Sequence, residues 1–184
     1  MKSYSGGCLC GAVRYRITSD PGPSRVCWCK DCQHISSNGT VNAVFPSASI
    51  EVTGTPAGYD KTADSGNTVT RRFCATCGSQ LFSDSTGRPG LTVVRVGTLD
   101  DPSAIRPTAN IWAASAPGWA CLDAGLDRFE GAPAPPAPRR GSRDEDRRRA
   151  QCGDGAAGHH RGTAPRLRFV PGGRQDLRDR SARQ

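Results

Sequence analysis

Seven of the nine cysteines in this chain lie in three short clusters, and this clustering constrains the fold more than any other feature. The clusters are a Cys-x-Cys pair, a Cys-x-Cys-x-x-Cys triplet and a Cys-x-x-Cys pair, formed by Cys8 and Cys10, by Cys27, Cys29 and Cys32, and by Cys74 and Cys77. Zinc closes a structural site with four protein ligands, whereas a catalytic zinc keeps three and leaves one position open. Seven thiols therefore predict two zinc ions per chain, one closed and one open.

The two pairs are the natural partners in the closed site. Cys74 and Cys77 precede Gly78, as in a zinc knuckle, where a glycine with positive φ aims backbone N–H groups at sulfur. Cys8 and Cys10 form the other pair, and a shared metal would close a loop of more than 60 residues. The triplet would then hold the second zinc. Three alternatives remain: mixed pairing of the triplet with the knuckle, one structural zinc with three spare thiols, or a fourth ligand from His34.

The rest of the sequence favours metal over disulfides. The first residues lack the apolar run of a signal peptide, and no segment approaches the roughly 18 apolar residues that span a bilayer. We therefore expect a cytoplasmic protein without membrane contact, where clustered cysteines bind metal more often than they pair. Of the two remaining thiols, we expect Cys121 to be half-buried and Cys152 to lie in a tail.

Composition divides the chain into residues 1–131, a candidate zinc-binding domain, and residues 132–184, an Arg-, Pro-, Gly- and Ala-rich tail. The tail has 13 Arg against 6 Asp plus Glu and so carries +7 of the net charge of +8. Its few large apolar residues predict a disordered segment, or one translated out of frame. Because the domain itself is nearly neutral, nucleic-acid binding is expected only non-specifically, through the tail. Only 24 of the domain's 131 residues are Leu, Ile, Val or Phe, so metal must help it fold.

The secondary-structure signal is mainly β. Alternating or β-branched runs separated by Gly-rich turns predict strands, at residues 12–17, 41–45, 49–53, 68–73, 91–96 and 109–112. No segment of ten or more residues shows a helical period, although residues 100–103 could open one helical turn. The sequence therefore predicts one small antiparallel β-sheet domain built around zinc.

These motifs together resemble the glutathione-dependent formaldehyde-activating enzyme family, also called the centromere-protein-V type. The segments that carry the resemblance are residues 6–15, the triplet 27–32, residues 72–81 and residues 97–102. It extends over about residues 5–133, with 129–131 similar to the family's usual end. One position departs from the family pattern: Trp28 stands where relatives often have His.

The resemblance implies an Mss4-like fold, a structural zinc at Cys8, Cys10, Cys74 and Cys77, and a second zinc at Cys27, Cys29 and Cys32 as the catalytic centre. It also implies glutathione as co-substrate and carbon–sulfur lyase chemistry on a small thiol adduct, such as S-hydroxymethylglutathione. A zinc with three thiolates has a net charge of −1 and is better suited to holding a thiolate than to making hydroxide. The alternative is a non-catalytic zinc module that binds glutathione, a protein or a polyanion.

Side chains that could meet the carboxylates of glutathione are Arg25 and Lys30, near the triplet in sequence, and Arg71 and Arg72, next to the knuckle. No Ser-His-Asp or paired-carboxylate arrangement stands out. His159 and His160 lie in the tail and are poor catalytic candidates.

Overall fold

The computed structural model describes residues 2–133 and 168–170. Its strands form two sheets, and its one α-helix is α1 (Lys30–Ser36). The smaller sheet has the order β1-β2-β5-β12 and the larger one the order β11-β10-β3-β4-β9-β8-β7-β6. The strands are β1 Tyr4–Gly7, β2 Arg14–Ile17, β3 Ser24–Cys27, β4 Thr40–Pro46, β5 Ile50–Thr53, β6 Ala57–Thr62, β7 Thr68–Phe73, β8 Gln80–Ser85, β9 Leu91–Arg95, β10 Ala109–Ile111, β11 Asp127–Arg128 and β12 Arg168–Val170. Single 3₁₀ turns are η1 Ser47–Ser49, η2 Val96–Thr98, η3 Pro102–Ala104 and η4 Ala113–Ser115.

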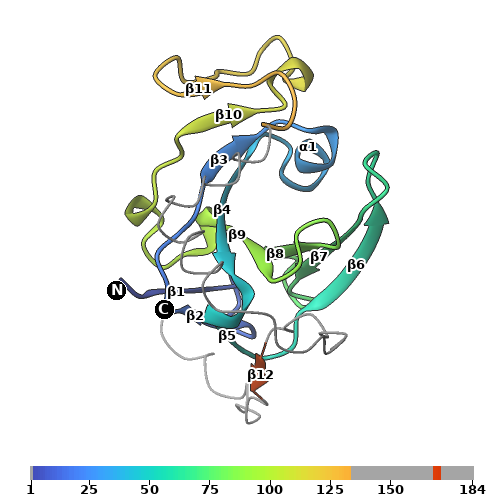
Figure 1. The fold of residues 1–184 in the computed structure, drawn as a ribbon. Coiled ribbons are helices and arrows are strands. Elements are labelled where there is room, and N and C mark those ends of the chain that lie inside the picture. Colours follow the sequence, from blue (N-terminus) through green and yellow to red (C-terminus); the bar gives the residue numbers. More distant parts are fainter. Residues whose placement is uncertain (1, 134–167, 171–184) are drawn as a thin grey trace, which may run out of the picture.

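Most neighbouring strands are antiparallel, as expected. The exceptions are β10, which runs parallel to both β3 and β11, and β12, which runs parallel to β5. Figure 1 shows how the larger sheet curves, so that α1, which follows β3, faces the β6–β7 hairpin. This curvature brings the start of α1 close to strands that lie far from it in the sequence.

The hydrophobic core lies between the two sheets. Tyr15 of β2 packs edge-on against Phe82 of β8, with ring centroids 5.0 Å apart, and Tyr4 of β1 packs against Phe45 of β4 at 5.8 Å. The Tyr15 hydroxyl shares a hydrogen bond with Thr98. Burial raises the pKa of Tyr15 to about 12, so its hydroxyl keeps its proton. These aromatic pairs connect the two sheets, and the buried apolar residues of both sheets complete the core.

The mainly β prediction is confirmed, and the six expected strands correspond to β2, β4, β5, β7, β9 and β10. The helical turn expected near 100–103 is the 3₁₀ turn η3. The prediction that Cys121 is half-buried is wrong: it is exposed, in a segment without regular structure. Within the described residues, no helix is long and apolar enough to cross a membrane.

The expectations about the tail fall almost wholly outside the described residues. Only residues 132–133 and the short strand β12 are described there, so the disorder predicted for 132–184 stays a prediction. Cys152, His159 and His160 also lie outside the described part.

Candidate metal centres

Four cysteine sulfurs meet where the β1–β2 turn approaches the β7–β8 turn. The Sγ atoms of Cys8, Cys10, Cys74 and Cys77 all lie within 4.8 Å of one another. The Sγ–Sγ distances are 3.6 Å from Cys8 to Cys10 and 3.7 Å from Cys10 to Cys74. A tetrahedral zinc with Zn–S bonds of about 2.3 Å has ligand sulfurs about 3.8 Å apart. The spacing therefore fits four thiolates around one zinc.

Hydrogen bonds to sulfur support the thiolate form at two of these cysteines, Cys8 and Cys77. The Val13 N–H donates to Cys8 Sγ at 3.2 Å, and the Cys77 sulfur lies 3.2 Å from the Ser79 hydroxyl. Hydrogen bonds from the Ser79 side chain and backbone lower the pKa of Cys77 to about 5. Gly78 has φ of 73°, the positive value expected of a knuckle glycine. Cys8 and Cys74 also belong to the hydrophobic core, so this centre is continuous with the packing between the sheets.

The triplet lies at the junction of β3 and α1. Cys27 ends β3, Cys29 is the N-cap of α1, and Cys32 lies in the first turn of that helix. A seven-residue helix is too short to show a period in the sequence. The cap still brings the three Sγ atoms within 4.8 Å of one another, and the Cys32 N–H donates to Cys29 Sγ at 3.5 Å. Cys27 and Cys32 are buried, whereas Cys29 is half-exposed.

The three thiols and a buried arginine favour negative charge at Cys32. Hydrogen bonds from Cys27 and Cys29 hold the pKa of Cys32 far below its usual range, and Thr40 and the positive charge of Arg95 add to the effect. Hydrogen bonds with Cys29 and Cys32, together with burial, raise the pKa of Cys27. Arg95, at the end of β9, donates from Nη1 toward Cys32 Sγ at 4.0 Å and to Thr40 Oγ1 at 3.2 Å. Three converging sulfurs beside a cation are a donor set that fits zinc.

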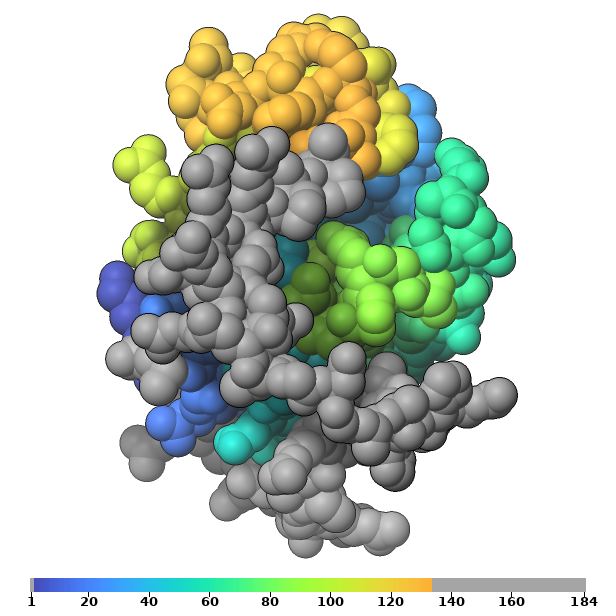
Figure 2. Space-filling view, in the orientation of Figure 1, coloured from blue at the N-terminus to red at the C-terminus, as the bar shows by residue number. Residues whose placement is uncertain are grey.

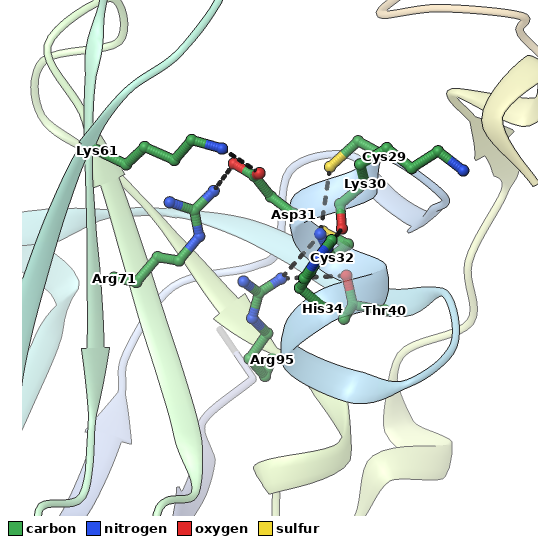
Figure 3. A network of polar contacts seen from close by, with 9 residues as sticks. All are labelled: Cys29, Lys30, Asp31, Cys32, His34, Thr40, Lys61, Arg71 and Arg95. Atoms are coloured by element: carbon green, nitrogen blue, oxygen red, sulfur yellow. Dashed lines mark hydrogen bonds and ion pairs between the residues drawn. The ribbon is translucent and has the colours of Figure 1, made fainter.

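A second group of charges connects α1 to the β6–β7 hairpin. Asp31 accepts from Lys61 Nζ at 2.5 Å and from Arg71 Nη2 at 2.7 Å (Figure 3). The Lys61 hydrogen bond is the main cause of the lowered pKa of Asp31, and the Arg71 charge adds to it. This network places the cations of Lys61 and Arg71 beside Asp31, which precedes Cys32 in the sequence.

The four basic residues expected to meet a substrate occupy different places. Arg71 lies beside the triplet and not at the knuckle, because its side chain points along the sheet to Asp31. Lys30 donates to the Ser115 carbonyl oxygen, also next to the triplet. Arg72 pairs with Asp84 at 2.9 Å, on another part of the sheet. Arg25 is half-buried, and this burial, with the nearby Arg88 charge, lowers its pKa.

The structure also places His34, the possible fourth ligand, and Trp28, the residue that departs from the family pattern. His34 is exposed and its Nδ1–H donates to the Lys30 carbonyl oxygen, so it does not join the three sulfurs. Trp28 is buried, donates from Nε1 to Asn110 Oδ1, and lies against Gly39, where a Cβ would come within 2.9 Å of the indole. The tryptophan therefore connects the α1–β4 turn to β10.

The sequence reasoning missed Arg95, Asp31 and Lys61. Asp31 and Lys61 look like ordinary surface charges in the sequence. Arg95 carried a weak signal, since it ends a strand of otherwise apolar and β-branched residues. In the structure it is 8% exposed.

A family model described as glutathione-dependent formaldehyde-activating enzyme matches residues 3–115, a span that contains both cysteine groups. The chain belongs to this family. The match confirms the resemblance seen in the sequence, and residues 116–133 lie beyond it.

No curated protein matches the sequence of this member of the glutathione-dependent formaldehyde-activating enzyme family. Among solved structures, a protein of Rhodobacter sphaeroides is similar at 20% identity and a TM-score of 0.46. The alignment covers 68% of this chain and 98% of that one.

The Asp31 network predicts a measurable contribution to stability. Asp31→Asn should lower the free energy of unfolding at pH 7 by about 1 kcal/mol, because it removes two ion pairs at a partly exposed carboxylate. Since the folded pKa lies below the ordinary value of 3.8, this stabilisation is present above that pH and is lost as the pH falls through the lowered pKa.

Urea unfolding at low and high salt measures this effect, since salt screens partly exposed pairs. Asp64→Asn, at an exposed turn residue, is the matched control. If both variants lose the same free energy of unfolding, or if the loss in Asp31→Asn does not change with salt, the ion pairs of Asp31 do not stabilise the fold.

Proposed function

We propose that the chain is a zinc-dependent enzyme of carbon–sulfur lyase type, which makes or breaks the bond between a glutathione sulfur and a one-carbon carbonyl unit. The observation that carries this proposal is the group of three sulfurs at Cys27, Cys29 and Cys32. Among the described residues, no fourth Cys, His, Asp or Glu joins it. Three protein ligands are the arrangement of a zinc that keeps one position for an exchangeable ligand.

When bound there, zinc would supply stabilisation of a substrate thiol as thiolate at neutral pH. The three cysteines would hold the metal at the half-exposed side of Cys29, where a ligand can approach. Arg95 orients Cys32 from the buried side through its contacts with Cys32 Sγ and Thr40. Arg95 and Thr40 thus lie on the buried side of the three sulfurs, and Lys30, Lys61 and Arg71 form the rim of the open side.

The rim is cationic, which suits glutathione because its two ends carry carboxylates. Asp31 fixes the positions of Lys61 and Arg71, and Lys30 lies on the opposite side, against Ser115. An attacking thiolate forms an S–C bond to formaldehyde while the C=O π electrons become an alkoxide that takes a proton from water. The reverse reaction breaks the S–C bond and returns the electron pair to sulfur. The rim cations would hold the peptide ends in place during either step.

The proposal is tested by following the second zinc during a glutathione titration of protein loaded with two zinc ions. Zinc-edge X-ray absorption should show added sulfur, because one of the two metals gains a fourth thiolate. The analogue with serine in place of the glutathione cysteine is the matched control and should add no sulfur. Formation of S-hydroxymethylglutathione, followed by ¹³C NMR with labelled formaldehyde, measures turnover. Unchanged sulfur coordination, or no catalysed turnover, would favour a non-catalytic zinc module.

A further inference from the structure

The turn between α1 and β4 contains the chain's one Asn-Gly pair, Asn38 and Gly39. In such a pair the backbone nitrogen of the glycine can attack the side-chain amide of the asparagine, because glycine has no side chain to shield it. Asn38 is exposed and belongs to no helix or strand, so water reaches its side chain. The pair therefore has the composition and the exposure that this amide chemistry requires.

The two reacting groups already lie together. The Gly39 N–H donates to Asn38 Oδ1 at 2.8 Å, and this N–H lies outside the sheet, because the described pairing of β3 with β4 begins at Thr40. The hydrogen bond encloses Gly39 N and the C, Cα, Cβ and Cγ atoms of Asn38, which are the ring atoms of a succinimide. Only the bond from Gly39 N to Asn38 Cγ is missing. The last side-chain torsion of asparagine is broad, so the amide can turn Cγ toward that nitrogen.

Packing fixes the glycine of this pair. A Cβ at Gly39 would lie 2.9 Å from the Trp28 indole, so no residue with a side chain fits there without a shift. Trp28 stands between the first two cysteines of the triplet, and Thr40, which follows the glycine, accepts from Arg95 (Figure 3). A covalent change in this turn therefore acts on residues that neighbour the three-sulfur group.

We propose that Asn38 and Gly39 form a site of spontaneous modification, at which the asparagine deamidates through a succinimide to aspartate and isoaspartate. The Gly39 nitrogen gives its proton to water, and its electron pair forms the bond to Asn38 Cγ. The bond from Cγ to the side-chain nitrogen breaks, and that nitrogen takes a proton and leaves as ammonia. Water then opens the ring: cleavage at Cγ gives aspartate, and cleavage at the backbone carbonyl carbon of Asn38 gives isoaspartate. Water is the only co-reactant, and no atom is oxidised or reduced.

Both products change the end of α1. Each places a carboxylate just beyond the C-cap of the helix, Ser37, where the last carbonyl groups disfavour negative charge. Isoaspartate also carries the main chain through Cβ and Cγ, which lengthens the turn by one methylene and moves Gly39 relative to the Trp28 indole. We therefore expect the modified protein to melt at a lower temperature and to show a changed environment of Trp28.

The test is prolonged incubation of the zinc-loaded full chain at neutral pH, followed by peptide mapping with mass spectrometry. Asn38 should convert at least about ten-fold faster than the three other asparagines, which precede residues with side chains. Part of the product should be isoaspartate, since direct hydrolysis of the amide gives only aspartate. Asn67 is the matched control, because it too lies in a turn, between β6 and β7, and precedes threonine. The Asn38→Gln variant keeps an amide at this place but would have to form a larger ring, so it should stay unmodified.

The indole N–H signal of Trp28, which donates to Asn110, reports whether the change reaches the triplet. In ¹⁵N NMR it should shift in step with conversion, whereas the signal of exposed Trp119 should not. If Asn38 converts no faster than Asn67, or forms aspartate alone, the inference is overturned. If Asn38 converts but the Trp28 signal and the melting temperature stay unchanged, the modification does not act on the triplet and that part of the inference fails. None of these measurements depends on lyase activity.

Discussion

Replacing Cys74 with serine is expected to unfold the domain. Cys74 is 1% exposed and lies in the hydrophobic core together with Cys8. The four-sulfur group joins the β1–β2 turn to the β7–β8 turn across 64 residues, so a metal there closes a long loop. Structural zinc contributes about 10–16 kcal/mol of apparent binding free energy in small peptides, as much as the whole stability of an ordinary domain at about 5–15 kcal/mol. We expect little soluble protein, and no cooperative thermal transition.

A serine hydroxyl in the core would itself be destabilising, so a second variant separates metal from packing. Cys10 belongs to the same four-sulfur group but is exposed and lies outside the core. Cys10→Ser should therefore also lose one zinc and most of the stability, whereas exposed Cys121, outside both groups, should tolerate serine. Circular dichroism melting and zinc analysis of the three variants measure this. If Cys10→Ser melts like the parent, the four sulfurs do not hold a structural metal.

The neighbours of the triplet come from segments that lie far apart in the sequence. In Figure 2 the β10–β11 segment forms the top of the molecule, α1 lies below it, and the β6–β7 hairpin forms the edge. Asp31 and Arg71, 40 positions apart, meet only because the larger sheet curves. Arg95 reaches Cys32 only because β9 pairs with β4, which follows α1. Such contacts depend on strand order, which spacing and periodicity do not encode.

What the sequence does predict is local. Strand β7 has the bounds expected from its β-branched run, and the cysteine spacing anticipated which sulfurs lie together. Strand β1 was missed because its Tyr-Ser-Gly-Gly sequence resembles a turn. The structure gives another reason for its glycine: a Cβ on Gly6 would lie 2.4 Å from the Tyr15 ring and from the Thr98 carbonyl oxygen. Strand β6 is largely exposed and has no apolar alternation, so its conformation depends on pairing with β7.

Cys29→Ser should give the opposite result from Cys74→Ser: a folded protein with one zinc and no activity. The triplet connects only β3 to the adjoining α1, so its metal closes a short loop and contributes little to stability. Serine is among the preferred N-cap residues, so the change preserves the start of α1. The three sulfurs also lie outside the core between the sheets. The melting temperature should stay within about 5 °C of the parent's.

Activity should fall much further than stability. Changing residues that merely support a metal ligand costs about 10–100-fold in affinity or activity, so losing a ligand should reduce turnover of S-hydroxymethylglutathione by at least about 100-fold. Zinc analysis, thermal melting and the labelled-formaldehyde assay on the same preparation test all three parts. Cys121→Ser again serves as the control for removing a thiol. If Cys29→Ser unfolds like Cys74→Ser, the triplet is a structural site. If Cys29→Ser keeps both zinc ions and full turnover, the triplet takes no part in the reaction. Loss of activity without loss of folding is expected only of an exchangeable metal centre.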